Sequence, residues 1–265
     1  MRPRKSLGQH FLHDRNVIAR IVAAVDPQPG EHFVEIGPGR GALTRPLLER
    51  GVQLDVVEVD RELAETLRRD WTDPGLRVHG ADALSFDYTA LASGPRSLRL
   101  AANLPYNIST PLLFHLLAQA AVFRDFTVML QREVVERMVA APGTGDYGRL
   151  TVSLAARCRV EKLFLVRPGS FTPPPQVDSA VVRVVPEPER LLAITDVARF
   201  DALVSRAFTM RRKRLSNALK GVVEPAVFAA TGIDPGLRPG DLSPAQYVAL
   251  ANAVANPSGA AATPV

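Results

Sequence analysis

The sequence is poor in the features that define several classes of protein. Its 265 residues contain a single cysteine, Cys158, so neither an internal disulfide nor a zinc site of clustered cysteines is possible. We expect Cys158 to be a small buried residue rather than a reactive thiol. No run approaches the roughly 20 apolar residues of a membrane helix, and residues 1–9 lack the apolar stretch of a signal peptide. These absences predict a cytoplasmic protein without membrane contact or a metal site.

The content of hydrophobic and charged residues indicates a globular protein, and the net charge indicates an anionic partner. Hydrophobic residues make up 46% of the chain and charged residues 22%, and the length suits one large domain with a small one. The net charge of +5 has the sign expected for binding a polyanion. Codon bias explains an arginine- and alanine-rich composition equally well, so charge alone does not identify the partner.

Alternating strand-like and helix-like segments fill the first two thirds of the chain, without internal repeats. Short apolar runs are separated by segments long enough for helices, which predicts a mostly parallel, doubly wound α/β sheet. The predicted strands cover residues 32–36, 54–59, 76–79, 98–102 and 126–131.

The pattern changes after Val185. A proline- and glutamate-rich segment, 186–189, interrupts the chain, and residues 197–220 and 244–255 then show helical spacing. We therefore predict a first domain over residues 1–185 and a small α-helical domain over residues 186–255. Residues 256–265 are rich in Ala, Gly, Ser and Pro, which favours a disordered tail.

A glycine-rich turn follows the first predicted strand. Gly37 and Gly39 precede an amphipathic helix, so backbone can approach a ligand without obstruction by side chains. Gly37, Gly39 and Ala42 also fit the dinucleotide pattern, with Glu58 lying 21 residues beyond Gly37. An adenosine cofactor of either kind, or a turn that binds nothing, is compatible with this stretch alone.

Two carboxylates follow later strands, at the sheet edge where such folds bind ligands. Glu58 is placed to accept hydrogen bonds from ribose hydroxyls, whereas Asp60 fits the N-cap of the next helix. Asp82 can accept from an adenine amine, with the Ala83 amide nearby as a donor, although a simple turn aspartate is the alternative.

The fourth predicted strand ends at residues 103–106, whose sequence NLPY resembles the motif of adenine-amine methyltransferases. The adenine amine is a poor nucleophile because its lone pair is delocalised into the ring. Acceptors on its hydrogens favour the pyramidal nitrogen of the transition state. The Asn103 side-chain oxygen and the Leu104 carbonyl are the predicted acceptors.

The remaining residues of this segment suit the same reaction. Pro105 lacks an amide hydrogen and fixes the backbone, and Tyr106 offers a face on which the target base stacks. An ordinary strand-end turn is the alternative. Because a sulfonium methyl is already activated, direct transfer needs mainly proximity, and we expect no covalent enzyme intermediate and no metal.

Over nearly its whole length the chain resembles the KsgA-type small-subunit ribosomal RNA adenine dimethyltransferases. The likeness rests on segments in the family's order and spacing: residues 7–12 (LGQHFL), residues 34–39 with Glu58 and Asp82, residues 103–111 and residues 169–179. The resemblance implies a Rossmann-like class I methyltransferase domain that binds S-adenosyl-L-methionine. It assigns the cofactor to His10, Leu12, Gly37, Gly39, Glu58, Asp82, Ala83 and Asn103.

The resemblance also implies a substrate. It predicts N6,N6-dimethylation of two adjacent adenosines near the 3′ end of small-subunit rRNA, within a 30S or pre-30S particle, by a monomeric enzyme with a role in ribosome biogenesis. Phe171 would cover the second face of the flipped adenine. The alternative is that Phe171 is a residue of the hydrophobic core.

A basic stretch in the predicted helical domain fits a phosphate backbone. No acidic residue interrupts residues 206–220, although a merely solvated basic helix face is the alternative. Arg2, Arg4 and Lys5 extend the predicted footprint. The predicted RNA-binding residues of the stretch are Arg206, Arg211, Arg212, Lys213, Arg214 and Lys220.

Three rival functions remain at this point. A large-subunit rRNA methyltransferase of the macrolide-resistance type shares the catalytic motif but not the target. A mainly non-catalytic ribosome-assembly or transcription factor would not need the intact motif. An NAD-dependent oxidoreductase fits the glycine turn but gives residues 103–106 no role.

Overall fold

The protein forms two compact units in the structure, a computed structural model that describes residues 9–255. The sheet unit comprises residues 9–135 and 160–186, and the helical unit comprises residues 136–159 and 187–255. The predicted boundary at residue 185 lies beside the observed one at Pro186. Residues 136–159 were expected in the first domain, but they join the helical unit because Val152 and Ala156 lie in its hydrophobic core.

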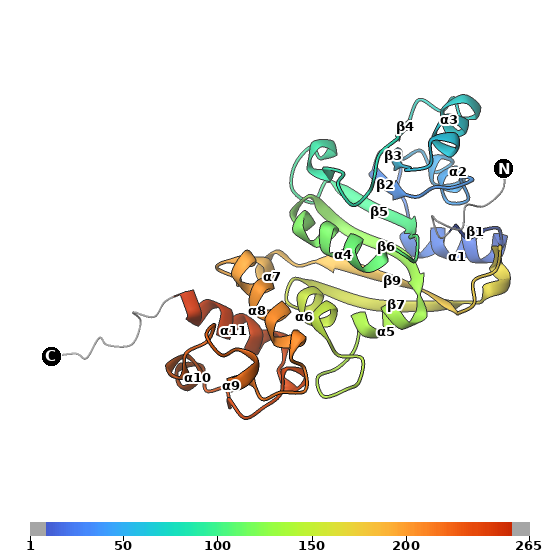
Figure 1. The fold of residues 1–265 in the computed structure, drawn as a ribbon. Coiled ribbons are helices and arrows are strands. Elements are labelled where there is room, and N and C mark those ends of the chain that lie inside the picture. Colours follow the sequence, from blue (N-terminus) through green and yellow to red (C-terminus); the bar gives the residue numbers. More distant parts are fainter. Residues whose placement is uncertain (1–8, 256–265) are drawn as a thin grey trace. The chain divides into compact units, whose positions relative to one another are not determined.

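A seven-stranded sheet organises the first unit (Figure 1). The pairs from β4 to β6 are parallel, whereas β9 runs antiparallel to β6. In spatial order the strands are β4 (Leu76–His79), β3 (Gln53–Val57), β2 (His32–Ile36), β5 (Leu98–Asn103), β6 (Phe123–Gln131), β9 (Ser179–Pro186) and β7 (Cys158–Val166).

The structure confirms the mostly parallel sheet and all five predicted strands. The third strand in the chain, β3, ends at Val57, so Glu58 lies just beyond it at the carboxyl edge. Two strands of this sheet were not anticipated, β7 and β9. The run 180–185 is apolar enough to have predicted β9, but β7 alternates irregularly between buried and exposed residues. Cys158, the first residue of β7, is buried as expected, and burial raises the pKa of its thiol to about 12.

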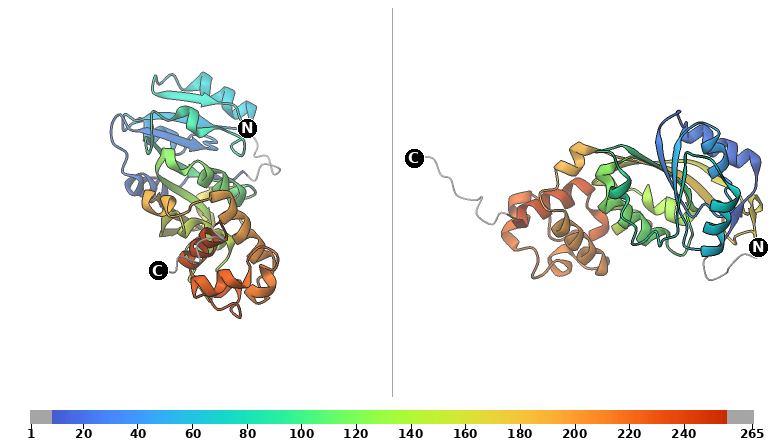
Figure 2. Two further views of the ribbon diagram at one scale, coloured as in Figure 1. Left: turned by 90° about the vertical axis from the view of Figure 1, so that its left-hand side faces the viewer. Right: turned by 90° about the horizontal axis from the view of Figure 1, so that it is seen from above.

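Helices cover both faces of the sheet, with α1 and α4 on opposite faces (Figure 2). Asp14 caps α1 by accepting from the backbone amides of Asn16 and Val17, and Val17 and Ile21 enter the core one helical turn apart. Asp60 caps α3, as its position in the sequence predicted. The helices of the unit are α1 (Arg15–Val25), α2 (Thr44–Leu48), α3 (Arg61–Asp70) and α4 (Ser109–Ala118).

A second, two-stranded sheet joins the start of the described chain to a late segment. Strand β1 (Phe11–Leu12) pairs antiparallel with β8 (Phe171–Thr172), with Leu12 opposite Phe171. This pairing fixes residues 9–12 beside the glycine turn, because the ring of Phe11 lies against Gly39. Residues 7 and 8 of the N-terminal motif lie outside the described residues, as do Arg2, Arg4 and Lys5 and the predicted tail.

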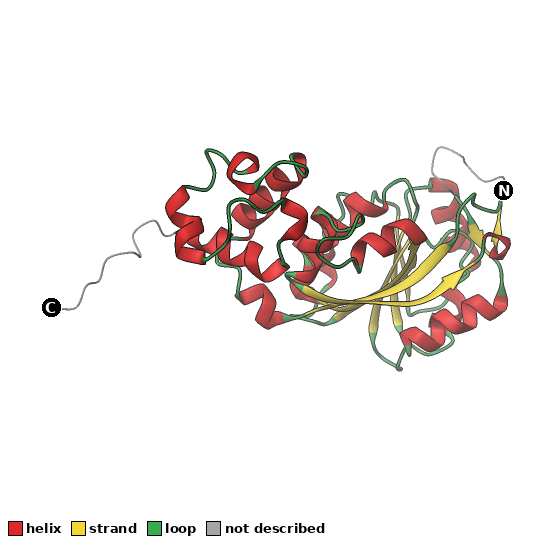
Figure 3. Ribbon diagram, turned by 90° about the horizontal axis from the view of Figure 1, so that it is seen from below, coloured by secondary structure: helices red, strands yellow, loops and turns green. Residues whose placement is uncertain are grey.

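Helices build the second unit; Figure 3 draws the helices of both units in red. The expected helical stretch 197–220 is two helices separated by a turn at residues 210–214. No helix within residues 9–255 is long and apolar enough to cross a membrane. The helices are α6 (Arg149–Ala155), α7 (Pro188–Leu192), α8 (Val197–Thr209), α9 (Leu215–Ala218), α10 (Pro225–Thr231) and α11 (Pro244–Ala255), while α5 (Arg132–Met138) crosses the boundary.

Candidate active site

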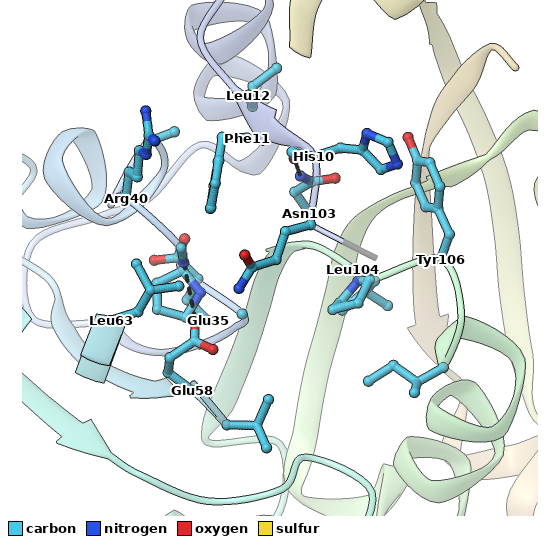
Figure 4. Close-up of a pocket in the computed structure, with 18 of the residues that line it drawn as sticks. His10, Phe11, Leu12, Glu35, Arg40, Glu58, Leu63, Asn103, Leu104 and Tyr106 are labelled. Carbon is cyan, nitrogen blue, oxygen red and sulfur yellow. Dashed lines mark hydrogen bonds between the residues drawn. The ribbon is translucent and has the colours of Figure 1, made fainter. Parts of the chain in front are cut away.

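One pocket gathers most of the predicted cofactor and catalytic residues at the carboxyl edge of the parallel strands (Figure 4). Its walls come from the segment around β1, the turn after β2, the ends of β3 and β5, and the loop after β4. Parallel α/β sheets bind ligands at this edge because the strand-to-helix turns converge there. The fold therefore unites segments that are far apart in the sequence.

The backbone of the glycine turn lines one side of the pocket. Gly37 and Gly39 adopt φ values of +63° and +58°, which other residues adopt only with strain. A Cβ atom on Gly39 would lie 3.0 Å from the Phe11 ring. The Gly37 amide donates to the Val57 carbonyl at 2.9 Å, so the turn is tied to the end of β3. This arrangement fits a ligand that approaches the backbone closely.

Glu58 lies in the pocket with both carboxylate oxygens oriented by backbone amides. Oε2 accepts from Gly39 N at 3.3 Å, and Oε1 accepts from Asp60 N at 2.9 Å. The side chain is buried, and burial raises the pKa of its carboxyl. Each oxygen has a second lone pair, so the orientation leaves acceptor capacity for ligand hydroxyls.

The sequence reasoning missed a second carboxylate in the pocket, Glu35. Glu35 is 2% exposed, and Thr44 Oγ1 donates to its Oε2 at 2.7 Å. Burial raises the pKa of the Glu35 carboxyl to about 8, and the nearby Glu58 charge acts in the same direction. The available signal was an acidic residue in the mostly apolar strand β2, two residues before Gly37. A cation placed beside this buried carboxyl would favour its ionised form and lower its pKa.

The loop after β4 contributes one of its two predicted residues. Asp82 lines the pocket, and its Oδ1 accepts from the Leu84 amide at 2.9 Å as in an ordinary aspartate turn. Ala83 is buried beneath the loop and is not among the described lining residues, whereas Leu84 is. The side chains alternate along the loop, so the residue after Asp82 turns into the core. Tyr88 OH donates to the Ala83 carbonyl at 3.1 Å.

Asn103 is the last residue of β5 and points into the pocket. Its Nδ2 donates to the His10 carbonyl at 3.2 Å, and its buried Oδ1 has no hydrogen-bond partner. A carbonyl only accepts, so this bond fixes which end of the amide faces His10. Leu104 N donates to the Met129 carbonyl at 3.1 Å and ties the segment to β6. An unsatisfied buried acceptor is costly unless a ligand completes it.

Tyr106 stands beside Asn103 with its ring held at two points. Its hydroxyl shares a 2.5 Å hydrogen bond with Ser179 Oγ, and its face is stacked against the His10 ring with centroids 5.4 Å apart. Burial raises the pKa of the phenol, so the hydroxyl stays protonated. His10 and Leu12 both line the pocket.

The structure corrects the place expected for Phe171. The ring is 2% exposed and belongs to a hydrophobic core cluster that includes Leu12, Met129 and Val181. Its partner across the small sheet is Leu12, which directs the ring into the core. Phe171 is not among the described residues that line the pocket. The alternative prediction, that Phe171 is an aromatic residue of the core, agrees with its position.

The six predicted RNA-binding residues are all exposed on the helical unit. They lie on the last turn of α8, in the turn 210–214 and two residues beyond the end of α9. Arg211 also donates to the Thr144 carbonyl at 2.9 Å, which holds its guanidinium against a neighbouring loop. Residues 211–214 are four consecutive exposed cations.

The sheet order, the glycine turn and the position of Asn103 define a class I methyltransferase fold. Residues 1–256 match the model of the family described as "Ribosomal RNA adenine dimethylase". The chain belongs to this family.

Individual relatives show the same relationship. A protein of Alcanivorax borkumensis named "Ribosomal RNA small subunit methyltransferase A" is 53% identical over 251 residues, covering 95% of this chain and 90% of the relative. The crystal structure of a dimethyladenosine transferase from Plasmodium falciparum has a TM-score of 0.79 and 26% identity, covering 91% and 96%. The crystal structure of the 23S rRNA methyltransferase ErmE has a TM-score of 0.68 and 28% identity, covering 92% and 99%.

Proposed function

We propose that this enzyme transfers methyl groups from S-adenosyl-L-methionine to the N6 amines of two adjacent adenosines near the 3′ end of small-subunit rRNA. The observation that carries the proposal is the unpartnered, buried Oδ1 of Asn103 beside the Tyr106 ring. An acceptor at that place completes its hydrogen bonding with the amine of a stacked adenine.

The cofactor fits the pocket through groups that the chain already orients. Glu58 would accept from the ribose hydroxyls, and Asp82 from the adenine amine. Gly37 and Gly39 leave room at the turn, and His10 and Leu12 close the opposite side. Glu35 adds a carboxyl that suits the cationic end of such a molecule. When bound, the cofactor supplies an activated methyl group on a sulfonium.

The protein's own part in the reaction is to position and polarise the amine. Asn103 Oδ1 and the Leu104 carbonyl accept from the amine hydrogens, which favours the pyramidal nitrogen as its lone pair turns toward the methyl group. Pro105 restricts the backbone between these acceptors and Tyr106. The Tyr106 ring orients the base by stacking. Positioning the two reactants accounts for a large share of the rate.

The choice of small-subunit RNA, within a 30S or pre-30S particle, rests on the relatives and on the helical unit. The Alcanivorax relative is named for the small subunit and is 53% identical. The exposed cations of residues 206–220 suit rRNA phosphates. We propose a cytoplasmic monomer that contributes to 30S biogenesis.

The second candidate is methylation of large-subunit RNA, favoured by the structural similarity to ErmE at 28% identity. Transfer of a radiolabelled methyl group to under-methylated small subunits, with large subunits in parallel, separates the two. We expect label in small subunits, slow transfer by Asn103→Ala and weak cofactor binding by Glu58→Ala. Full activity of Asn103→Ala would refute the acceptor role.

A further inference from the structure

His10 is joined to both residues that the target adenine has to reach. Its backbone carbonyl accepts from Asn103 Nδ2 at 3.2 Å, and its imidazole stacks on Tyr106 with an interplanar angle of 27°. Figure 4 shows the imidazole turned toward Tyr106 and away from Glu58. The backbone and the side chain of His10 therefore serve different parts of the pocket.

The imidazole is held in this place by a second contact. Nδ1 lies 2.8 Å from the Pro173 carbonyl, and because a carbonyl only accepts, Nδ1 carries the hydrogen. The bond is exposed to solvent, so water can replace it when the ring leaves. Tyr106 has an anchor that does not involve His10, the hydrogen bond of its hydroxyl to Ser179.

We propose that the His10 imidazole occupies the stacking place of the target adenine and has to swing away before the base binds. This inference rests on the proposed function. The target adenine has to hydrogen-bond to Asn103 through its amine and stack on Tyr106 through its ring. It must therefore occupy the space beside Tyr106 that the His10 imidazole now fills. An imidazole is the five-membered half of a purine, so it offers Tyr106 the same kind of aromatic face.

The movement needs only a side-chain rotation. The His10 carbonyl keeps its bond to Asn103, so the cofactor side of the residue is unchanged when the ring departs. Because the ring competes with the base, the apparent affinity for the RNA is the intrinsic affinity reduced by the fraction of protein with the ring displaced. His10 thus disfavours free nucleobases, which lack the further contacts of an RNA.

Variants without a ring at position 10 test the proposal. We expect His10→Ala and His10→Asn to lower the KM for under-methylated small subunits by roughly 3- to 10-fold, as removal of a competing stack predicts. His10→Phe retains a ring and should keep the KM at or above that of the wild type. The matched control is His13→Ala, because His13 is exposed and is not among the described lining residues.

Cofactor affinity, measured by equilibrium dialysis with labelled S-adenosyl-L-methionine, should be the same in all four variants. A KM that is unchanged or raised in both His10→Ala and His10→Asn would overturn the proposal. Weaker cofactor binding by these two variants would also overturn it, because it would assign the imidazole to the cofactor. A wild-type protein that transfers no methyl group would instead refute the proposed function.

A readout independent of activity is the NMR signal of the His10 ring proton, identified by its loss in His10→Asn. Stacking on Tyr106 shifts this resonance through the ring current. Saturating adenosine should move it toward the unstacked position in the presence of cofactor. A resonance that stays in place while adenosine binds would refute the displacement.

Discussion

The side-chain amide of Asn103 donates to the backbone carbonyl of His10 at 3.2 Å and leaves its own Oδ1 buried without a partner. The hydrogen bond from Nδ2 to His10 orients the side-chain amide. Oδ1, the other polar atom of the amide, is thereby left as an acceptor that faces the pocket. The segment around β1 therefore orients the side chain that we propose as the acceptor for the adenine amine. Variants of the residues around this pair should separate cofactor binding from methyl transfer.

Glu58→Gln should weaken cofactor binding by about 10- to 100-fold, the loss expected when a hydrogen bond to a charged group is removed. Equilibrium dialysis with labelled S-adenosyl-L-methionine measures the change. Glu65→Gln is the matched control, because Glu65 is exposed on α3 and is not a described lining residue. Equal affinities for Glu58→Gln and the control would contradict the ribose contact.

Glu35 should make the cofactor-free protein less stable as the pH rises. Burial raises the pKa of its carboxyl to about 8, against 4.5 for an ordinary glutamate. Between these values the folded protein keeps a proton that the unfolded chain has lost, so the free energy of unfolding falls with pH. Thermal unfolding at pH of about 5.5 and about 8 should show a larger drop in Tm for the wild type than for Glu35→Gln. Parallel pH profiles would be inconsistent with a protonated Glu35.

Gly39→Ala should destabilise the fold by about 1–2 kcal/mol, because alanine at a left-handed φ is strained. Its Cβ would also lie 3.0 Å from Phe11, so cofactor binding should weaken as the segment around β1 shifts. Gly94→Ala is the control: a Cβ there meets no atom within 4 Å, and the change should stay within about 0.5 kcal/mol. Chemical denaturation measures the free energy of unfolding of both variants. Equal losses for Gly39→Ala and Gly94→Ala would show that the left-handed φ of Gly39 does not matter for stability.

The double variant Arg212→Ala with Lys213→Ala should weaken binding to small subunits and lower its salt dependence. Each lost phosphate contact reduces the slope of log affinity against log salt concentration by about 0.7–0.9. Cofactor affinity should not change. Arg50→Ala, an exposed arginine of the sheet unit, is the control for a simple loss of charge. An unchanged slope in the double variant would remove these residues from the RNA interface.

The sequence predicted the sheet and most of the pocket because those features depend on local patterns. Gly37 and Glu58 follow strands and Asn103 ends one, and strand ends meet at one edge of a parallel sheet. The position of the Phe171 side chain depends instead on the β1–β8 pairing, which joins segments about 160 residues apart in the sequence and turns the ring into the core.

Three other features required the tertiary structure. The stack of His10 on Tyr106 needs the Pro173 carbonyl to orient the imidazole, and no local pattern relates these three residues. The elevated pKa of Glu35 depends on its burial and on the distance to Glu58 in space. Residues 136–159 similarly join the helical unit through contacts of Val152 that spacing along the chain does not reveal.

The central claim is that Asn103 presents an acceptor to an adenine amine of small-subunit rRNA. Mass-spectrometric mapping of RNA from under-methylated small and large subunits, treated with cofactor and either wild type or Asn103→Ala, tests it most directly. We predict N6,N6-dimethyladenosine at two adjacent positions near the 3′ end of the small-subunit RNA with the wild type, and much less of it with Asn103→Ala in the same time. Modification confined to large-subunit RNA, or undiminished dimethylation by Asn103→Ala, would contradict it.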